Sequence, residues 1–484
     1  MRRTLTALIA LSLAGCSGGG GSGSVSAGGG STGTSTPTPT PTTAAGCTLR
    51  ERQTWAAAQL NEWYLFPETL PTSLDPTPYS TVGAYVDALT ATARSQGRDR
   101  YFTYVTSIAE ENAYYNSGSS AGFGFRLYLS GNRLYSAETF EGTSALAAGI
   151  DRGTEIQAIG TTTANLQNVS DILASGGTDA LTAALGPSTA GTSRVMRIND
   201  TAGGTRVVTV SKTDYTLDPV SSRYGAKIID DGGHRVGYVN LRTFINTADS
   251  PLRAAFANFK AQGVTEVIID LRYNGGGLVS IAELMGNLMG ANRSTSDVFD
   301  YMTFRASKSA QNETAYFAPQ TQSIAPTRVA FIGTSSTASA SELVAAGMLP
   351  YLGTNMALVG TNTYGKPVGQ IAIDKAACDD RFRIIAFALE NRDHQGAYFN
   401  GLAGTVKASC RASDDIAYQL GDPREASTRA ALDFIQGKSC TAISAVGGTS
   451  ASARSTGETG SPSAQQLLSP KAPSVPQRDV PGLF

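Results

Sequence analysis

The chain has 484 residues, a length that exceeds a single hydrophobic core and predicts two or three domains. Charged residues make up only 16%, and the formal net charge is -1, so the chain has no basic field that would bind nucleic acid. Only two histidines occur, His234 and His394, which leaves little material for a histidine-rich metal site or a Ser-His-Asp triad.

The N-terminus has the features of an export signal. Two arginines precede a short apolar run over 5–13, shorter than the roughly 20 residues that a membrane-spanning helix needs. The segment Leu-Ala-Gly-Cys at 13–16 resembles the bacterial lipoprotein signal, which implies cleavage before Cys16 and lipidation of its thiol. The alternative is an ordinary signal peptide followed by a chance cysteine.

We therefore expect a lipoprotein signal peptide at 1–15 and a protein anchored by lipid in the cell envelope, facing the periplasm. Because Ser17 follows Cys16 and no Asp does, the outer membrane is favoured. Residues 16–46 are almost purely Gly, Ser, Thr, Ala and Pro and predict a solvated tether. Residues 441–484 are also poor in large apolar side chains, and we expect a disordered tail there.

Four cysteines remain after Cys16. An exported chain meets oxidising conditions, and the even number permits two disulfides. Of the three possible connectivities, we expect Cys378 with Cys410 and Cys47 with Cys440. No CxxC pair or neighbouring histidine supports a zinc site, so we expect neither metal nor cofactor.

Residues 47–104 predict a small helical unit, because large apolar side chains such as Trp55 and Leu60 recur at helical spacing. From 105 to 215 the pattern changes to short strands separated by turns that contain Gly or Asn. Within that region the loop Gly122-Phe123-Gly124-Phe125 and the segment 144–160 resemble, in order, the carboxylate-binding loop and the helix-turn-strand of a PDZ domain. The resemblance implies that backbone N–H groups of the loop bind the C-terminus of a peptide.

Residues 216–440 form the largest block. Apolar strands at 236–240, 267–271, 328–333 and 357–360 alternate with helices, which predicts an α/β layered structure. We expect the helix that follows the third strand to begin at Glu342. Three segments of this block could carry chemistry.

The first segment, 270–277, reads Asp-Leu-Arg-Tyr-Asn-Gly-Gly-Gly. Glycines at the end of a buried strand let a substrate approach the backbone, and exposed N–H groups at a helix start favour negative charge. This predicts half of an oxyanion hole; a structural turn is the alternative, and no GKS/T signature supports a phosphate loop.

The second segment, 337–344, places Ser341 among small residues at the expected start of a helix, whose N-terminus stabilises developing negative charge. Taken alone, Ser341 is better explained as an N-cap, because serine commonly precedes a helix in that role. The third segment, 364–370, holds Lys366 between a glycine and a proline. If it is buried, its pKa falls and the neutral amine can take a proton; the alternative is an exposed loop lysine.

Together the three segments resemble the C-terminal processing peptidase family, also called tail-specific proteases. That family carries a DLR-x-N-x-GG strand end, a SASASE-like serine segment, and a GK segment with Gln four residues after the Lys. The resemblance implies a crotonase-like or ClpP-like α/β peptidase core at 216–440, preceded by a PDZ-like domain and the helical unit.

Carried over residue by residue, the resemblance implies that Ser341 is the nucleophile and Lys366 the general base. Gln370 would orient Lys366, and the N–H groups of Gly276 and Glu342 would hold the oxyanion. The expected substrates are proteins or peptides cleaved near their C-termini. Two alternatives remain: a catalytically silent protein that binds C-termini, and a crotonase-like enzyme acting on a small molecule.

Overall fold

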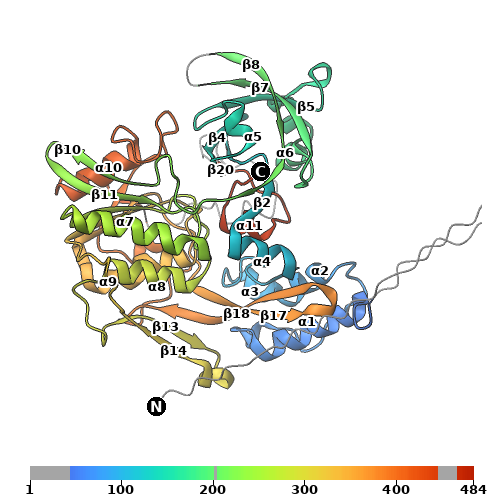
Figure 1. Cartoon of the computed structure of the whole chain (residues 1–484). Coiled ribbons are helices and arrows are strands. Elements are labelled where there is room, and N and C mark those ends of the chain that lie inside the picture. Colours follow the sequence, from blue (N-terminus) through green and yellow to red (C-terminus); the bar gives the residue numbers. More distant parts are fainter. Residues whose placement is uncertain (1–43, 201–203, 445–465) are drawn as a thin grey trace, which may run out of the picture. The chain divides into compact units, whose positions relative to one another are not determined.

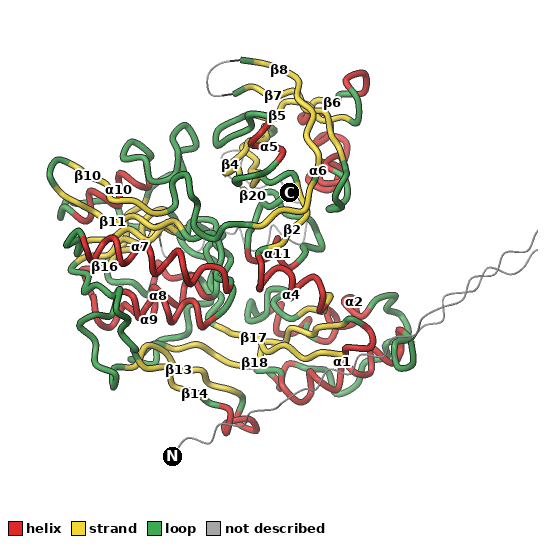
Figure 2. Tube along the Cα trace, viewed as in Figure 1, coloured by secondary structure: helices red, strands yellow, loops and turns green. Residues whose placement is uncertain are grey.

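The computed structural model describes residues 44–200, 204–444 and 466–484 (Figures 1 and 2). The predicted signal peptide, the tether as far as residue 43, and Cys16 lie outside these residues. No helix in the described ranges is both long enough and apolar enough to cross a membrane.

The N-terminal helices pack on a sheet whose strands, apart from β1, come from residues 298–390. Trp55 and Leu60 of α1 belong to one apolar cluster with Phe382 and Ile384 of β18. β18 pairs with β1, β13 and β17, all antiparallel. The elements of this layer are α1 (Leu49–Trp63), α2 (Val82–Leu89), α3 (Ala91–Ser95), β1 (Tyr104–Ser107), β13 (Val298–Phe304), β14 (Glu313–Tyr316), β17 (Val368–Lys375) and β18 (Asp380–Glu390).

A strand-rich unit follows α4 (Ile108–Ser117). Its main sheet has the order β20-β3-β4-β5-β7-β8, with β6 paired to β5, and β2 pairs separately with β9. The elements are β2 (Ser119–Gly122), β3 (Phe125–Ser130), β4 (Arg133–Thr139), α5 (Ser144–Ala147), β5 (Glu155–Gly160), β6 (Gln167–Asn168), α6 (Val169–Leu185), β7 (Ser193–Asn199), β8 (Thr205–Ser211) and β9 (Thr213–Thr216).

The largest block is a sheet of order β10-β11-β12-β15-β16-β19, parallel except for β10, as the α/β prediction requires. Alternate side chains of β12 enter opposite apolar clusters: Val267 and Ile269 face α7, α8 and α9, whereas Ile268 faces α10. The elements are β10 (Ala226–Asp231), β11 (His234–Asn240), α7 (Asp249–Ala261), β12 (Glu266–Asp270), α8 (Val279–Leu288), β15 (Arg328–Gly333), α9 (Ala340–Leu352), β16 (Met356–Gly360), β19 (Ser409–Arg411) and α10 (Ala426–Ile435).

The end of the chain is ordered, so the predicted disordered tail over 441–484 is wrong for residues 466–484. β20 (Gln466–Leu467) pairs with β3, and α11 (Val475–Asp479) follows. The physical reason is local: Val480, Leu483 and Phe484 are all buried in apolar clusters, although the wider segment is poor in such residues.

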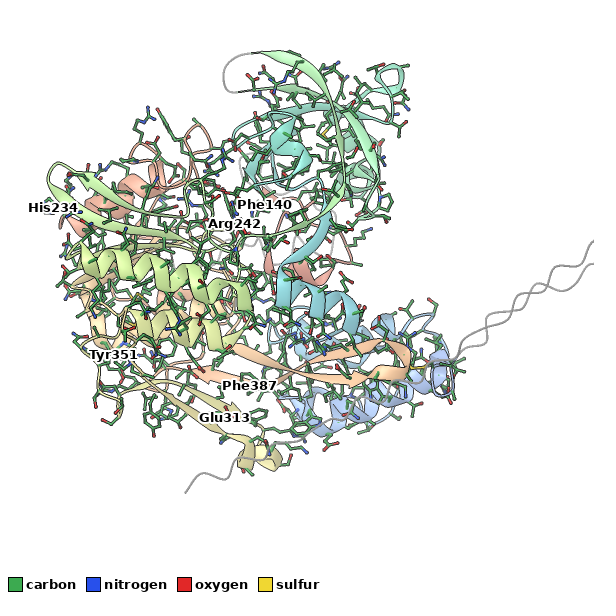
Figure 3. All side chains as sticks on the ribbon, viewed as in Figure 1. Phe140, His234, Arg242, Glu313, Tyr351 and Phe387 are labelled. Carbon is green, nitrogen blue, oxygen red and sulfur yellow. A yellow bond between two sulfur atoms is a disulfide. The ribbon has the colours of Figure 1, made fainter. Side chains whose placement is uncertain are left out.

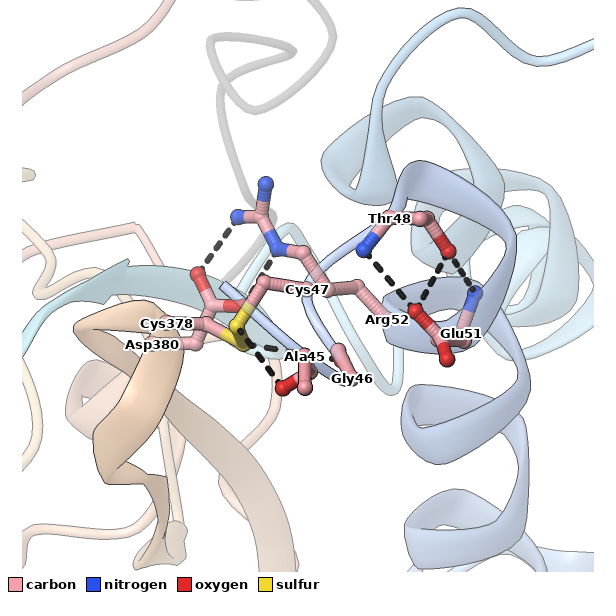
Figure 4. Close-up of a disulfide and its surroundings, with 8 residues drawn as sticks. All are labelled: Ala45, Gly46, Cys47, Thr48, Glu51, Arg52, Cys378 and Asp380. Atoms are coloured by element: carbon pink, nitrogen blue, oxygen red, sulfur yellow. Dashed lines mark hydrogen bonds and ion pairs between the residues drawn. A yellow bond between two sulfur atoms is a disulfide. The ribbon is translucent and has the colours of Figure 1, made fainter. Parts of the chain in front are cut away.

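All four predicted cysteines form disulfides, but the predicted pairing is wrong. Cys47 bonds to Cys378 and Cys410 bonds to Cys440. Cys47 lies just before α1, which packs on β18, and Cys378 lies in the turn between β17 and β18 (Figure 4). Packing of α1 on this hairpin therefore brings together two cysteines that are 331 positions apart in the sequence.

Candidate functional site

The strand end at Asp270 is fixed by a buried network of charges. Arg272 is fully buried and forms ion pairs with Asp270, Asp414 and Glu425. Tyr238 donates a further hydrogen bond of 2.8 Å to Asp270. These contacts join the end of β12 to the segment before α10, so the glycines that follow are held on a rigid support.

The glycine loop packs directly against the serine segment. The Asn274 side chain donates to the carbonyl of Leu241 at 2.9 Å and accepts from the N–H of Gly276 at 2.9 Å. A Cβ atom on Gly276 would lie only 2.7 Å from Cβ of Ser339, and Gly276 has a φ of 116°. Close approach to Ser339 therefore requires glycine at this position.

Ser339 is the N-cap of α9 and has a rare backbone conformation. Its φ of 59° and ψ of -120° lie in a region that residues with a Cβ seldom adopt. The N–H of Ser339 donates to Oε2 of Glu342 at 3.1 Å, and the residue is only partly buried. The chain thus places Ser339 in a strained turn at the positive end of a helix.

Ser341, the residue predicted as nucleophile, lies inside the first turn of the same helix. Only 1% of its surface is exposed, and its Oγ donates to the carbonyl of Asn274 at 3.0 Å. The predicted helix start at Glu342 is wrong, because α9 begins at Ala340. The spacing Ser339-x-x-Glu342 is the signature of a capping box, and it is the signal that could have located the start correctly.

The carboxylate of Glu342 links the serine segment to the lysine segment. It accepts from Oγ1 of Thr363 at 2.6 Å and from the N–H groups of Gly365 and Lys366 at 2.7 Å each, in addition to Ser339. Burial raises the pKa of Glu342, and these four donors oppose the rise. Since Oε2 binds the N–H groups of both Ser339 and Lys366, the two backbones lie side by side. These contacts give the carboxylate of Glu342 a structural role; the oxyanion role of its N–H stays a prediction.

Lys366 is held as predicted by Gln370. Its Nζ donates to Oε1 of Gln370 at 3.1 Å and lies 4.9 Å from the ring centre of Phe102, while Nε2 of Gln370 donates to the carbonyl of Phe102. Burial lowers the pKa of Lys366 to about 8, and the neighbouring charge of Asp479 acts in the opposite direction. A lysine of this kind is neutral in part near pH 8 and can accept a proton.

The loop predicted to bind peptide termini joins β2 to β3. The side chains of Phe123 and Phe125 lie in the core of the strand-rich unit. The backbone N–H groups of Gly124 and Phe125 are hydrogen-bond donors of the loop. Both donate to the backbone oxygen of Phe484. Gly122 also approaches Phe484 so closely that a Cβ there would lie 2.9 Å from its carbonyl carbon.

Neither histidine belongs to this constellation. His234 begins β11 (Figure 3). Its Nδ1 approaches Glu266 at 3.8 Å, and His394 stacks on Tyr301 with a ring-centre distance of 4.4 Å. Both side chains are more than half exposed. Among the residues that the structure describes, no group of three or more His, Cys, Asp or Glu side chains could hold a metal ion.

Comparisons with known proteins agree with the fold and the motifs. Residues 235–397 match the model of peptidase family S41. The chloroplastic C-terminal processing peptidase of Tetradesmus obliquus is 26% identical over 176 residues, which are 35% of this chain and 36% of that protein. The carboxyl-terminal-processing protease of a Picosynechococcus species is 28% identical over 161 residues, 33% of this chain and 35% of that protein. The matches thus span about a third of these relatives.

Among solved structures, an S41 protease from Bacteroides fragilis superimposes with a TM-score of 0.61 at 20% sequence identity. The superposition covers 79% of this chain and 97% of that protein, which extends the shared fold well beyond the matched residues. The strand end at Asp270, the helix start at Ser339 and the lysine turn at Lys366 all fall within the matched range. Residues 235–397 therefore match a peptidase family S41 domain, and this part of the chain is similar to C-terminal processing peptidases.

Proposed function

We propose that the protein is a serine peptidase in which Ser339, rather than Ser341, is the nucleophile and Lys366 is the general base. The observation that carries the proposal is the strained backbone of Ser339, the partly exposed N-cap of α9. The carboxylate of Glu342 accepts from the N–H groups of both Ser339 and Lys366 and so joins the two segments. Strain of this kind persists at functional sites because the surroundings enforce it. Ser341 is the weaker candidate, since its hydroxyl already donates to a carbonyl inside the protein.

The reaction follows from these positions. The neutral amine of Lys366 takes the proton of the Ser339 hydroxyl while Oγ attacks the carbonyl carbon of a substrate peptide. The proton then passes to the leaving amine as the peptide bond breaks and an acyl-enzyme remains. A water molecule, deprotonated by Lys366, hydrolyses the ester and restores Ser339. Gln370 is a positioning residue, because it holds the amine in place.

Two backbone amides beside Ser339 suit the developing oxyanion. The N–H of Ala340 is the first of α9, where the helix dipole favours negative charge. The N–H of Gly276 donates to the Asn274 side chain here, and a substrate oxygen would replace that acceptor. In this assignment Ala340 takes the role that the sequence analysis gave to Glu342.

The substrates we propose are proteins or peptides with accessible C-termini. The strand-rich unit acts as a PDZ-like domain, whose donors at Gly124 and Phe125 suit a terminal carboxylate. A lipid on Cys16 would anchor the chain in the cell envelope; this location remains a prediction. Retention of the full-length precursor on membranes, and its loss in Cys16→Ser, would test the anchor.

The test of the active site compares matched serine variants. Purified protein and its Ser339→Ala, Ser341→Ala and Lys366→Ala variants are incubated with fluorogenic peptides that have free C-termini. We expect Ser339→Ala and Lys366→Ala each to lower kcat/KM by roughly 1000-fold or more, and the double variant to be little worse than either. Ser341→Ala should stay within about ten-fold of the parent and lose about 1 kcal/mol of stability with its hydrogen bond.

Inverse behaviour of the two serine variants would assign the nucleophile to Ser341. A parent protein that binds C-terminal peptides but cleaves none would favour the silent binding protein instead. His234→Ala and His394→Ala serve as controls and should leave turnover unchanged, because the proposed base is an amine.

A further inference from the structure

The last residues of the chain lie in the loop that is suited to a peptide terminus. The N–H groups of Gly124 and Phe125 donate to the backbone oxygen of Phe484 at 3.1 and 3.4 Å, and the N–H of Phe484 donates to the carbonyl of Phe125 at 3.1 Å. Reciprocal backbone bonds of this kind are how a peptide adds to an edge strand. The segment therefore binds in the manner expected of a substrate.

The same segment continues from this loop towards the glycine loop of the active site. The N–H of Leu127 donates to the carbonyl of Gly482 at 2.8 Å, and Arg126 donates to the carbonyl of Pro481 at 2.6 Å. Three residues before Gly482, the carbonyl of Asp479 accepts from the N–H of Gly275 at 2.8 Å.

Contact at the glycine loop is close. A Cβ on Gly275 would lie 2.3 Å from the carbonyl oxygen of Arg478, so the loop admits this backbone only because residue 275 is glycine. Gly275 immediately precedes Gly276, the residue that packs on Ser339. Residues 478–484 thus connect the PDZ-like loop with the catalytic turn.

The apolar side chains of the segment are buried in two hydrophobic clusters. Phe484 is 4% exposed in the core cluster of the strand-rich unit, and Val475, Val480 and Leu483 are buried in another cluster. That second cluster contains Tyr114, Tyr215 and Ile245, and α11 lies against α4 (Figure 1). Both the apolar anchors and the backbone bonds are those of a bound peptide.

The segment also brings charge to the catalytic base. Asp479 accepts a hydrogen bond of 2.9 Å from Tyr115, and its carboxylate raises the pKa of Lys366 against the effect of burial. A higher pKa keeps more of the amine protonated, and a protonated amine cannot act as a base. Arg478 of the same segment lowers the pKa of Lys366, so the segment brings charges of both signs close to the amine and opposes catalysis through occupancy.

We propose that residues 474–484 are an intramolecular ligand that occupies the peptide path from Gly124 to Gly275 and competes with peptide substrates for it. The effect on turnover rests on the proposed peptidase function, whereas the effect on peptide binding does not. A tethered ligand has an effective concentration in the millimolar range, so a free peptide must displace it before binding.

Two kinds of variant release the segment. One is a chain that ends at residue 473; the other keeps full length but carries Val480→Asp and Leu483→Asp, which place charges in the apolar cluster. Lys471→Ala is the matched control, since Lys471 is exposed and precedes the segment. Circular dichroism and thermal unfolding confirm that each variant is folded, and intact mass confirms that the segment is still attached where it should be.

Binding is measured with a labelled synthetic peptide of sequence 474–484, using chains that also carry Ser339→Ala so that no cleavage interferes. We expect the released variants to bind this peptide at least ten-fold more tightly than the full chain or the Lys471→Ala control. In active chains, release should raise kcat/KM for a peptide substrate at least ten-fold, and the 474–484 peptide should then inhibit competitively while a scrambled peptide does not.

Equal peptide affinity in folded, released and full-length chains would overturn the proposal. If release tightens binding but no variant cleaves any peptide, the intramolecular ligand stands and the peptidase function fails. If release leaves both peptide affinity and kcat/KM unchanged in an active enzyme, the peptidase function stands and the intramolecular ligand is refuted.

Discussion

Replacement of Lys366 by Met should abolish peptide cleavage and yet make the protein more stable at neutral pH. The amine is partly buried beside Phe102 and Gln370, and burial lowers its pKa from 10.5 to about 8. Below pH 8 the folded state must hold a charge in a site that disfavours it. Met has a similar length, no charge and no need for a partner.

The magnitude follows from the pKa of the two states. At about 1.4 kcal/mol for each unit of pKa, the gap between 10.5 and about 8 sets a ceiling of roughly 3.5 kcal/mol. Because Lys366 keeps one hydrogen bond and some exposure, we expect a gain of about 1–2 kcal/mol at pH 7. The unfolded chain holds the proton up to a higher pH than the folded chain does. The stability of the parent therefore rises between pH 8 and 10.5, and the advantage of the variant disappears over that range.

Urea denaturation at pH 7 and at pH 10.5, followed by tryptophan fluorescence, measures this difference. Lys438→Met is the control, because an exposed lysine should change stability by no more than about 0.5 kcal/mol. A Lys366→Met variant that is less stable at pH 7, or whose gain is the same at both pH values, would refute the reasoning. In the parent, cleavage should rise with pH through about 8 as the amine loses its proton.

Three further predictions concern the rest of the molecule. Arg272→Met leaves the buried carboxylates of Asp270 and Glu425 without their shared cation, and urea denaturation should show a loss of about 3–5 kcal/mol. The two carboxylate oxygens of Asp300 are buried without a hydrogen-bond partner, and burial raises the pKa of Asp300 to about 8, so the parent loses stability as pH rises from about 4 to 8. Asp300→Asn should therefore raise Tm at pH 9 but hardly at pH 4, and an equal rise at both pH values would contradict this. Non-reducing peptide mapping should find Cys47 joined to Cys378, and the Cys378→Ser variant should lose about 2–4 kcal/mol.

Much of the fold could be predicted because its signals are local. The buried strand before Arg272, the glycine loop and the lysine turn were located from residue type and order alone, and the alternating strands and helices gave the α/β core. Gln370 was paired with Lys366 correctly through the family resemblance, whose motif has Gln four residues after the Lys; Gln370 lies in β17, and Lys366 lies two residues before that strand.

The errors arose where the outcome depends on contacts between distant segments. The start of α9 was misplaced because Ser339 and Ser341 are the same residue type in one run of small residues. Only the capping contact between Ser339 and Glu342 shows that the helix begins after Ser339. The pairing of the cysteines depends on which segments pack together in the fold, and the positions of four cysteines in the sequence do not specify that. Residues 474–484 are ordered because they pack into apolar clusters formed with distant parts of the chain, so the low hydrophobicity of the segment itself misled the prediction.

The bond between Cys47 and Cys378 also determines how the molecule bears tension. A force applied to the chain before Cys47 is transmitted by the disulfide to the turn between β17 and β18, so α1 does not carry it. Those strands share a ladder of hydrogen bonds along eight paired positions, from Val368 to Lys375, and Lys366 lies just before it. The mechanical load of the N-terminal segment is thus carried by the hairpin next to the catalytic lysine. Reduction of this one bond would transfer the load to the end of a helix.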